Sequence, residues 1–66
     1  MPPSPFLMVT PDVGGAGKVR LDAVTLARVF ERDGKYVLRV RVTDGSWDDF
    51  EYNSLPAALV WLGKIK

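Results

Sequence analysis

The sequence predicts a small α+β domain: an antiparallel meander of three to four strands with one C-terminal helix packed on one face. Apolar and polar residues alternate through most of residues 18–52, and this period-two pattern is typical of strands. Two turn signals interrupt it, Asp33-Gly34 and Asp44-Gly45-Ser46. After residue 53 the apolar spacing becomes helical. With 66 residues, the chain has room for one domain.

The composition excludes several kinds of chemistry. The chain has no cysteine and no histidine, so it can form neither disulfides, nor zinc sites built on thiolate or imidazole, nor Cys–His or Ser–His nucleophiles. A net charge of +1 gives little attraction to nucleic acid or anionic lipid. No apolar run approaches the ~20 residues of a membrane span. We therefore expect a cytoplasmic protein with no cofactor, no metal and no membrane partner.

The N-terminal segment is rich in proline. Three prolines among the first five residues predict a flexible arm over 1–5, which leaves 6–66 as the single folded domain. Residues 6–10 have the composition of a short strand. We expect this strand either to add an edge to the sheet or to pair with a second subunit.

A glycine-rich loop follows over residues 12–17. Its Gly17-Lys18 pair is similar to the end of a phosphate-binding loop. That motif requires glycine where this chain has Asp12, and serine or threonine where it has Val19. An ordinary flexible loop is the expected structure.

The next strand, residues 18–31, is long enough that we expect it to bend or break near Asp22-Ala23. Asp33-Gly34 is a strong signal for a two-residue hairpin turn to the strand at residues 36–43. Such a turn sets the cross-strand pairs Arg32–Lys35, Phe30–Val37, Val29–Leu38, Arg28–Arg39, Ala27–Val40, Leu26–Arg41 and Thr25–Val42.

A three-residue loop, Asp44-Gly45-Ser46, should lead into the last strand at residues 49–53. This loop places Phe50 opposite Val40 and Tyr52 opposite Leu38 on the core face. On the other face it places Asp49 opposite Arg41 and Glu51 opposite Arg39. We therefore expect arginines and carboxylates to form a charge ladder on a solvated face.

The C-terminal helix should begin after Asn53 or Ser54, either of which can cap it, and end at Gly63. Pro56 is tolerated in a first turn. Apolar residues at helical spacing, namely Leu55, Ala58, Leu59 and Leu62, form one stripe toward the sheet. The expected core comprises Val29, Leu38, Val40, Phe50, Tyr52, Leu55, Leu59 and Leu62. Val60 and Trp61 lie off this stripe and indicate a second burial surface. We expect residues 64–66 to form a frayed helix end.

No set of residues points to catalysis. Four acidic residues lie near one another in the sequence: Asp44, Asp48, Asp49 and Glu51. They lack the spacing of a calcium-binding loop. Ser46 and Ser54 have no base to activate them, and a turn and a helix cap explain them. We therefore expect no enzyme and no small-molecule substrate.

Two functions are compatible with these features. The first is a non-enzymatic protein-binding module: an adaptor, regulator or stoichiometric inhibitor, by analogy with small proteins of phages and mobile elements, acting as a homodimer or on a larger partner. Its expected interface residues are Trp47, Val60, Trp61 and Ile65. Trp47 is either an exposed anchor for a partner or a cover for the sheet edge. The alternative is a single-stranded nucleic-acid-binding protein that uses Arg28, Phe30, Arg32, Arg39 and Arg41 on one sheet face.

Overall fold

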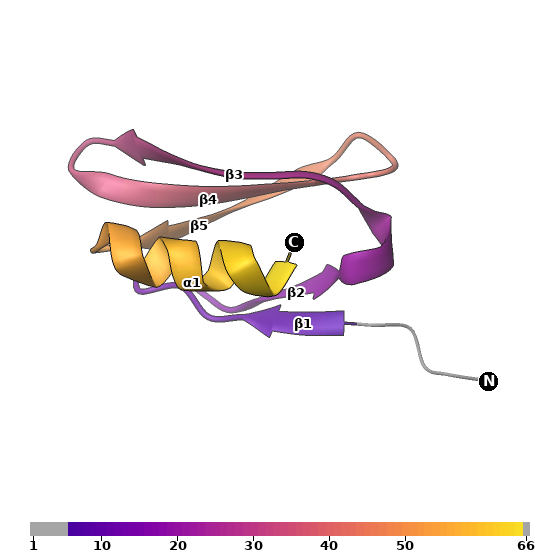
Figure 1. Cartoon of the computed structure of the whole chain (residues 1–66), viewed down its shortest axis with the longest axis horizontal. Helices are drawn as coiled ribbons and strands as arrows, with labels where there is room; N and C mark the ends of the chain where they lie inside the picture. The colour runs from indigo at the N-terminus through magenta and orange to yellow at the C-terminus, as the bar shows by residue number, and fades with distance from the viewer. Residues whose placement is uncertain (1–5, 66) are drawn as a thin grey trace.

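The strands and the helix form two layers in the computed structural model, which describes residues 6–65 (Figure 1). One layer is an antiparallel sheet with strand order β3-β4-β5, and the other, here called the lower layer, contains the β1-β2 hairpin and helix α1. The strand bounds are Phe6–Val9 for β1, Gly17–Arg20 for β2, Val24–Arg32 for β3, Lys35–Val42 for β4 and Trp47–Tyr52 for β5, and α1 spans Leu55–Ile65. The predicted α+β class, with an antiparallel meander and one helix on one face, is confirmed. The predicted arm at 1–5 lies outside the described residues.

The predicted long strand breaks where the sequence suggests. A 3-10 turn at Leu21–Ala23 separates β2 from β3 and carries the chain from one layer to the other. β1 adds no strand to the main sheet, since Phe6 pairs with Arg20 and Val9 with Gly17 in a separate hairpin. β2 is available to β1 because the break removes it from the main sheet.

The first hairpin follows local turn chemistry. Asp33 and Gly34 adopt positive φ angles of 52° and 77°, as a two-residue hairpin turn requires. Six of the seven predicted pairs are present, from Arg32–Lys35 to Leu26–Arg41. The seventh is wrong. A bulge between Val24 and Leu26 places Val24, not Thr25, opposite Val42.

The register of β5 differs from the prediction by two residues. The loop has three residues, but they are 43–45, with Gly45 at a φ of 90° and the Val42 N–H donating to the Ser46 carbonyl over 3.0 Å. Glycine supplies the left-handed conformation that the third position of such a loop requires. Phe50 therefore lies opposite Leu38 rather than Val40. Because the shift is even, every β5 side chain keeps its predicted face.

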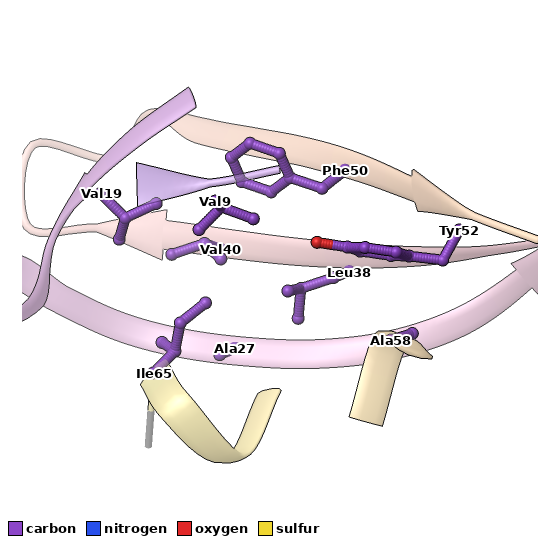
Figure 2. Packing of buried hydrophobic residues seen from close by; sticks show 9 residues of the cluster. All are labelled: Val9, Val19, Ala27, Leu38, Val40, Phe50, Tyr52, Ala58 and Ile65. Carbon is purple, nitrogen blue, oxygen red and sulfur yellow. The ribbon is translucent and has the colours of Figure 1, made fainter. Parts of the chain in front are cut away.

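The core lies between the two layers (Figure 2). Its buried side chains are Val9, Val19, Ala27, Leu38, Val40, Phe50, Tyr52, Ala58 and Ile65. The predicted core residues Leu38, Val40, Phe50 and Tyr52 are confirmed, whereas Val29 and Leu62 are half-buried. The contribution of the hairpin, through Val9 and Val19, was not predicted.

Helix α1 presents a different face from the predicted one. The Ser54 hydroxyl caps it by accepting the Ala57 N–H at 3.4 Å, and the helix continues past Gly63 to Ile65. Ala58 and Ile65 are buried, with Trp61 and Leu62 packed against the core beside them. Two predicted core residues, Leu55 and Leu59, are exposed instead. Both possible stripes contain Ala58 and Leu62, and the packing of Ile65 against the sheet selects this one.

Candidate functional site

The face of the main sheet that points away from the lower layer is uncovered in residues 6–65, and we call it the outer face. Its side chains come from alternate positions of the three strands. They are Leu26, Arg28, Phe30 and Arg32 from β3, Lys35, Val37, Arg39 and Arg41 from β4, and Trp47, Asp49 and Glu51 from β5. The structure thus brings together all five residues of the alternative, nucleic-acid site.

Two of the arginines on the outer face are held by carboxylates. Arg39 donates to Asp49 through Nε at 2.8 Å and Nη2 at 3.0 Å, which is a bidentate pair. Arg32 contacts Glu51 at 3.3 Å and Asp49 at 4.0 Å. The hydrogen bonds from Arg39 lower the pKa of Asp49, against a smaller opposing effect of desolvation. The expected charge ladder therefore exists, with partners one step along from those predicted.

Arg28 and Arg41 have no such partner. Neither forms an ion pair with a carboxylate of residues 6–65. The predicted pair of Asp49 with Arg41 is wrong, because the shifted register places Trp47 opposite Arg41. Arg28 lies directly opposite Arg39, which is a like-charge pair. The shifted register therefore leaves Arg41 without a carboxylate partner, whereas Arg32 gains Glu51.

Aromatic rings lie among these charges. The guanidinium carbons of Arg39, Arg28 and Arg32 lie 5.1, 5.4 and 6.0 Å from the centroid of the Phe30 ring. Arg39 also lies 5.4 Å from the ring of Trp47. Val37, directly opposite Phe30, is fully buried on this face. Phe30 and its arginines therefore form a packed cluster on the outer face.

Trp47 is an exposed aromatic residue on the outer face, with 56% of its surface accessible. It does not cover Phe50, which points to the opposite side of the sheet. Of the two expectations for this residue, the structure shows an exposed indole in contact with Arg39. Its position is compatible with an anchor for a bound molecule.

A second surface lies on the side of the lower layer that points away from the sheet. Leu7 and Val9 of β1 point into the core, so Phe6 and Met8 point outward and are 50% and 59% exposed. The ammonium of Lys18 lies 4.2 Å from the Phe6 ring centroid. These side chains leave the hairpin with an apolar outer side.

The helix adds further apolar surface to the lower layer. Val60 is 58% exposed, and Leu55 and Leu59 are exposed beside it. The other two predicted interface residues of the helix are placed differently. Trp61 packs against the core under the Lys64 ammonium, and Ile65 is buried at 7% exposure. Ile65 is therefore a core residue, because the helix extends beyond Gly63.

The strand edges differ in their protection. The edge of β5 is covered by the loop after β1, since the N–H groups of Asp12 and Val13 donate to the Glu51 carbonyl at 2.9 and 3.3 Å. The Asp12 carboxylate in turn accepts the Asn53 N–H at 3.0 Å. β1 pairs only with β2 within the described part of the chain. Its second edge is therefore available to another strand.

Residues 6–65 contain no cluster of three or more metal-ligating side chains. Ser46 is engaged by Asp44, whose pKa is lowered by the hydrogen bonds from the Ser46 hydroxyl and N–H. A hollow of about 480 Å³ has no titratable side chain in its lining, which comprises Leu21, Val24, Thr25, Leu26, Ala27 and Ile65. Within the same residues, the helix is too short to cross a membrane.

Comparisons with protein families, with curated proteins and with solved structures give no match for this chain.

Proposed function

We propose that this chain is a small non-enzymatic protein-binding module, of the adaptor or regulator type, that acts as a homodimer. The observation that carries the proposal is the apolar outer side of the lower layer, where Phe6, Met8 and Val60 are each at least half exposed. Exposed apolar patches of this kind are typical of protein-protein interfaces. The proposal includes a cytoplasmic location, since a chain without cysteine depends on no disulfide.

The open edge of β1 supports a second copy of this chain as the partner. An edge strand with exposed apolar side chains is a template for strand pairing. Two copies of β1 can pair antiparallel about a two-fold axis, since the same patch then serves both subunits. Phe6 and Met8 of each copy would lie on one side of the extended sheet. The edge of β3 is also unpaired in the described residues, so the exposed Phe6 and Met8, rather than the open edge alone, favour β1.

The size of the domain also supports dimerisation. Domains of about 60 residues bury only about 60% of the surface that the unfolded chain exposes, so they are marginally stable alone. A stable interface buries about 800 Å² on each partner, close to a fifth of the 4335 Å² surface of this chain. Burial of the outer side of the lower layer would compensate for the small core.

Sedimentation equilibrium tests the proposal. The wild-type chain should sediment as a dimer of 7.3 kDa subunits. Met8→Lys should give a folded monomer, because a charge on the outer side of an edge strand opposes pairing. Leu26→Lys is the matched control: it places the same charge on an exposed apolar position of β3, outside the lower layer, and should leave the dimer intact. A wild-type monomer at every concentration, or equal dissociation of both variants, would contradict the proposal.

A further inference from the structure

We propose that the outer face of the sheet is a binding site for single-stranded nucleic acid, with phosphates at Arg28 and Arg41 and bases stacked on Trp47 and on the cluster around Phe30. This site lies on the opposite side of the molecule from the proposed dimer surface. A result that contradicts one of the two proposals therefore leaves the other unaffected.

The outer face is positively charged. The outer face holds four arginines against two carboxylates, although the whole chain has a net charge of only +1. Both carboxylates are engaged, Asp49 by Arg39 and Glu51 by Arg32. The positive charge in excess therefore belongs to the other two arginines of this face and to Lys35, which lies opposite Arg32 at its end. An anion placed there would meet charges that the described part of the chain does not neutralise.

Arg28 and Arg41 lie close together on the outer face. Arg28 faces Arg39 across the β3-β4 pair, and like charges directly opposite each other destabilise a sheet. An anion bound near Arg28 would relieve this repulsion. Arg41 is two residues from Arg39 on the same strand and therefore lies on the same face. Arg28 and Arg41 are therefore diagonal neighbours across β3 and β4, and the Cα atoms of such neighbours are about 7–8 Å apart. An extended phosphate backbone that crosses the strands can contact both arginines.

Planar groups lie beside these charges. The Arg39 guanidinium lies 5.1 Å from the Phe30 centroid and 5.4 Å from that of Trp47, so it connects the two rings. Its bidentate pair with Asp49 holds it in one orientation. Aromatic rings and guanidinium groups are the surfaces on which unpaired bases stack in single-strand-binding proteins. The outer face therefore combines stacking groups with positive charge.

These planar groups favour a nucleic acid over an acidic protein segment. An acidic segment would use Arg28 and Arg41 but would leave the exposed indole of Trp47 without a role. A single strand uses both, because each nucleotide carries one phosphate and one planar base.

Fluorescence titration with an oligothymidylate tests the site. Trp61→Phe serves as the parent protein, so that the indole signal reports Trp47 alone. Added oligonucleotide should quench this signal at low salt, and the apparent affinity should fall as salt is added. The slope of log affinity against log salt should decrease by about 0.7 for each phosphate contact that is removed.

Arginine substitutions locate the site. Arg28→Gln and Arg41→Gln should each weaken binding by about fivefold to tenfold at low salt and reduce the salt slope. Arg20→Gln is the matched control, since it removes one positive charge from β2, where Arg20 contacts Asp22 at 2.8 Å. It should leave the affinity unchanged. Circular dichroism of each variant verifies that the fold is retained.

Three results would overturn the inference. The first is a fluorescence signal that does not change with oligonucleotide. The second is an equal loss of affinity in Arg20→Gln, which would show attraction to the overall charge rather than to the outer face. The third is competition by polyglutamate or by inorganic polyphosphate as strong as that by the oligonucleotide, which would show that bases contribute nothing.

Discussion

At the scale of single residues, the hydroxyl of Tyr52 is the most unusual group in the core. The side chain is 1% exposed, and the hydroxyl has no hydrogen-bond partner among the described residues. Figure 2 shows the ring lying over Leu38 with its oxygen pointing along the core toward Val40. A buried polar group without a partner lowers the stability of the folded state.

Replacing Tyr52 by phenylalanine should therefore stabilise the protein. We expect Tyr52→Phe to raise the free energy of unfolding by about 1 kcal/mol, since it removes an unsatisfied hydroxyl and keeps the ring. Urea unfolding at neutral pH measures the difference. A less stable variant would show that the hydroxyl has a partner in solution.

The raised pKa of Tyr52 predicts a loss of stability at alkaline pH. Burial, and to a smaller extent the charge of Asp12, raise the pKa of Tyr52 to about 12, whereas an unfolded tyrosine titrates near 10. Because the folded state holds the proton more tightly, the stability associated with this group is present below about pH 10 and is lost as the pH rises toward 12. The loss is on the order of 2 to 3 kcal/mol. The advantage of Tyr52→Phe over wild type in unfolding experiments should therefore grow across this range.

Gly17 marks a close approach between the two layers. A Cβ built on this residue would lie 2.6 Å from Cε1 of Phe50, in the middle of the core. Gly17→Ala should therefore destabilise the protein by about 1–3 kcal/mol, as overpacking does elsewhere. Gly15→Ala is the control, because a Cβ there meets nothing within 4 Å. Thermal unfolding of both variants checks the prediction, and equal melting temperatures would contradict it.

At the scale of elements, the sequence predicts that the helix ends at Gly63, whereas in the structure it continues to Ile65. If Gly63 ended the helix in a left-handed conformation, alanine would be unfavourable there. In the structure Gly63 lies inside α1, and a Cβ would meet nothing within 4 Å. We therefore expect Gly63→Ala to stabilise the protein by about 0.5–1 kcal/mol, the difference in helix propensity. Urea unfolding measures it, and a destabilised variant would place the helix end at Gly63.

The hairpins show how far local chemistry determines an element. Asp33-Gly34 allows one tight turn, and the pairs that follow from it are confirmed as far as Leu26. Asp44-Gly45-Ser46 permits more than one loop of the same length. The structure uses 43–45, because this choice puts Gly45 in the left-handed position and leaves the Asp44 carboxylate to accept the Ser46 N–H at 2.8 Å.

At the scale of the whole molecule, two layers leave two opposite surfaces uncovered in the described residues. The lower layer presents apolar side chains of β1 and α1, and the outer face presents arginines and aromatic rings. A dimer formed through β1 would leave both outer faces accessible. Loss of the dimer in Met8→Lys and loss of oligonucleotide binding in Arg28→Gln are therefore expected to be independent, since distant substitutions act additively.

The candidate sites were predictable only in part. Period-two alternation was sufficient to place Arg28, Phe30 and Arg39 on one face, because side chains alternate whatever the register. Whether Arg41 has an acidic partner depends on the register of β5. Moving the loop by one residue along the chain shifts this register by two residues. Val60 was expected at the surface and is exposed, whereas Ile65 was placed there and is buried.

The sequence by itself determined the kinds of elements, the first hairpin turn and the face of the main-sheet residues from Leu26 onward, because these follow from steric preferences and spacing between near neighbours. Only the tertiary structure decided the partner of β1, the face of α1 and the pairing of Arg41. Each of these is a choice between alternatives of similar local energy. Contacts between residues far apart in the chain, such as Gly17 with Phe50 and the packing of Ile65, settle such choices.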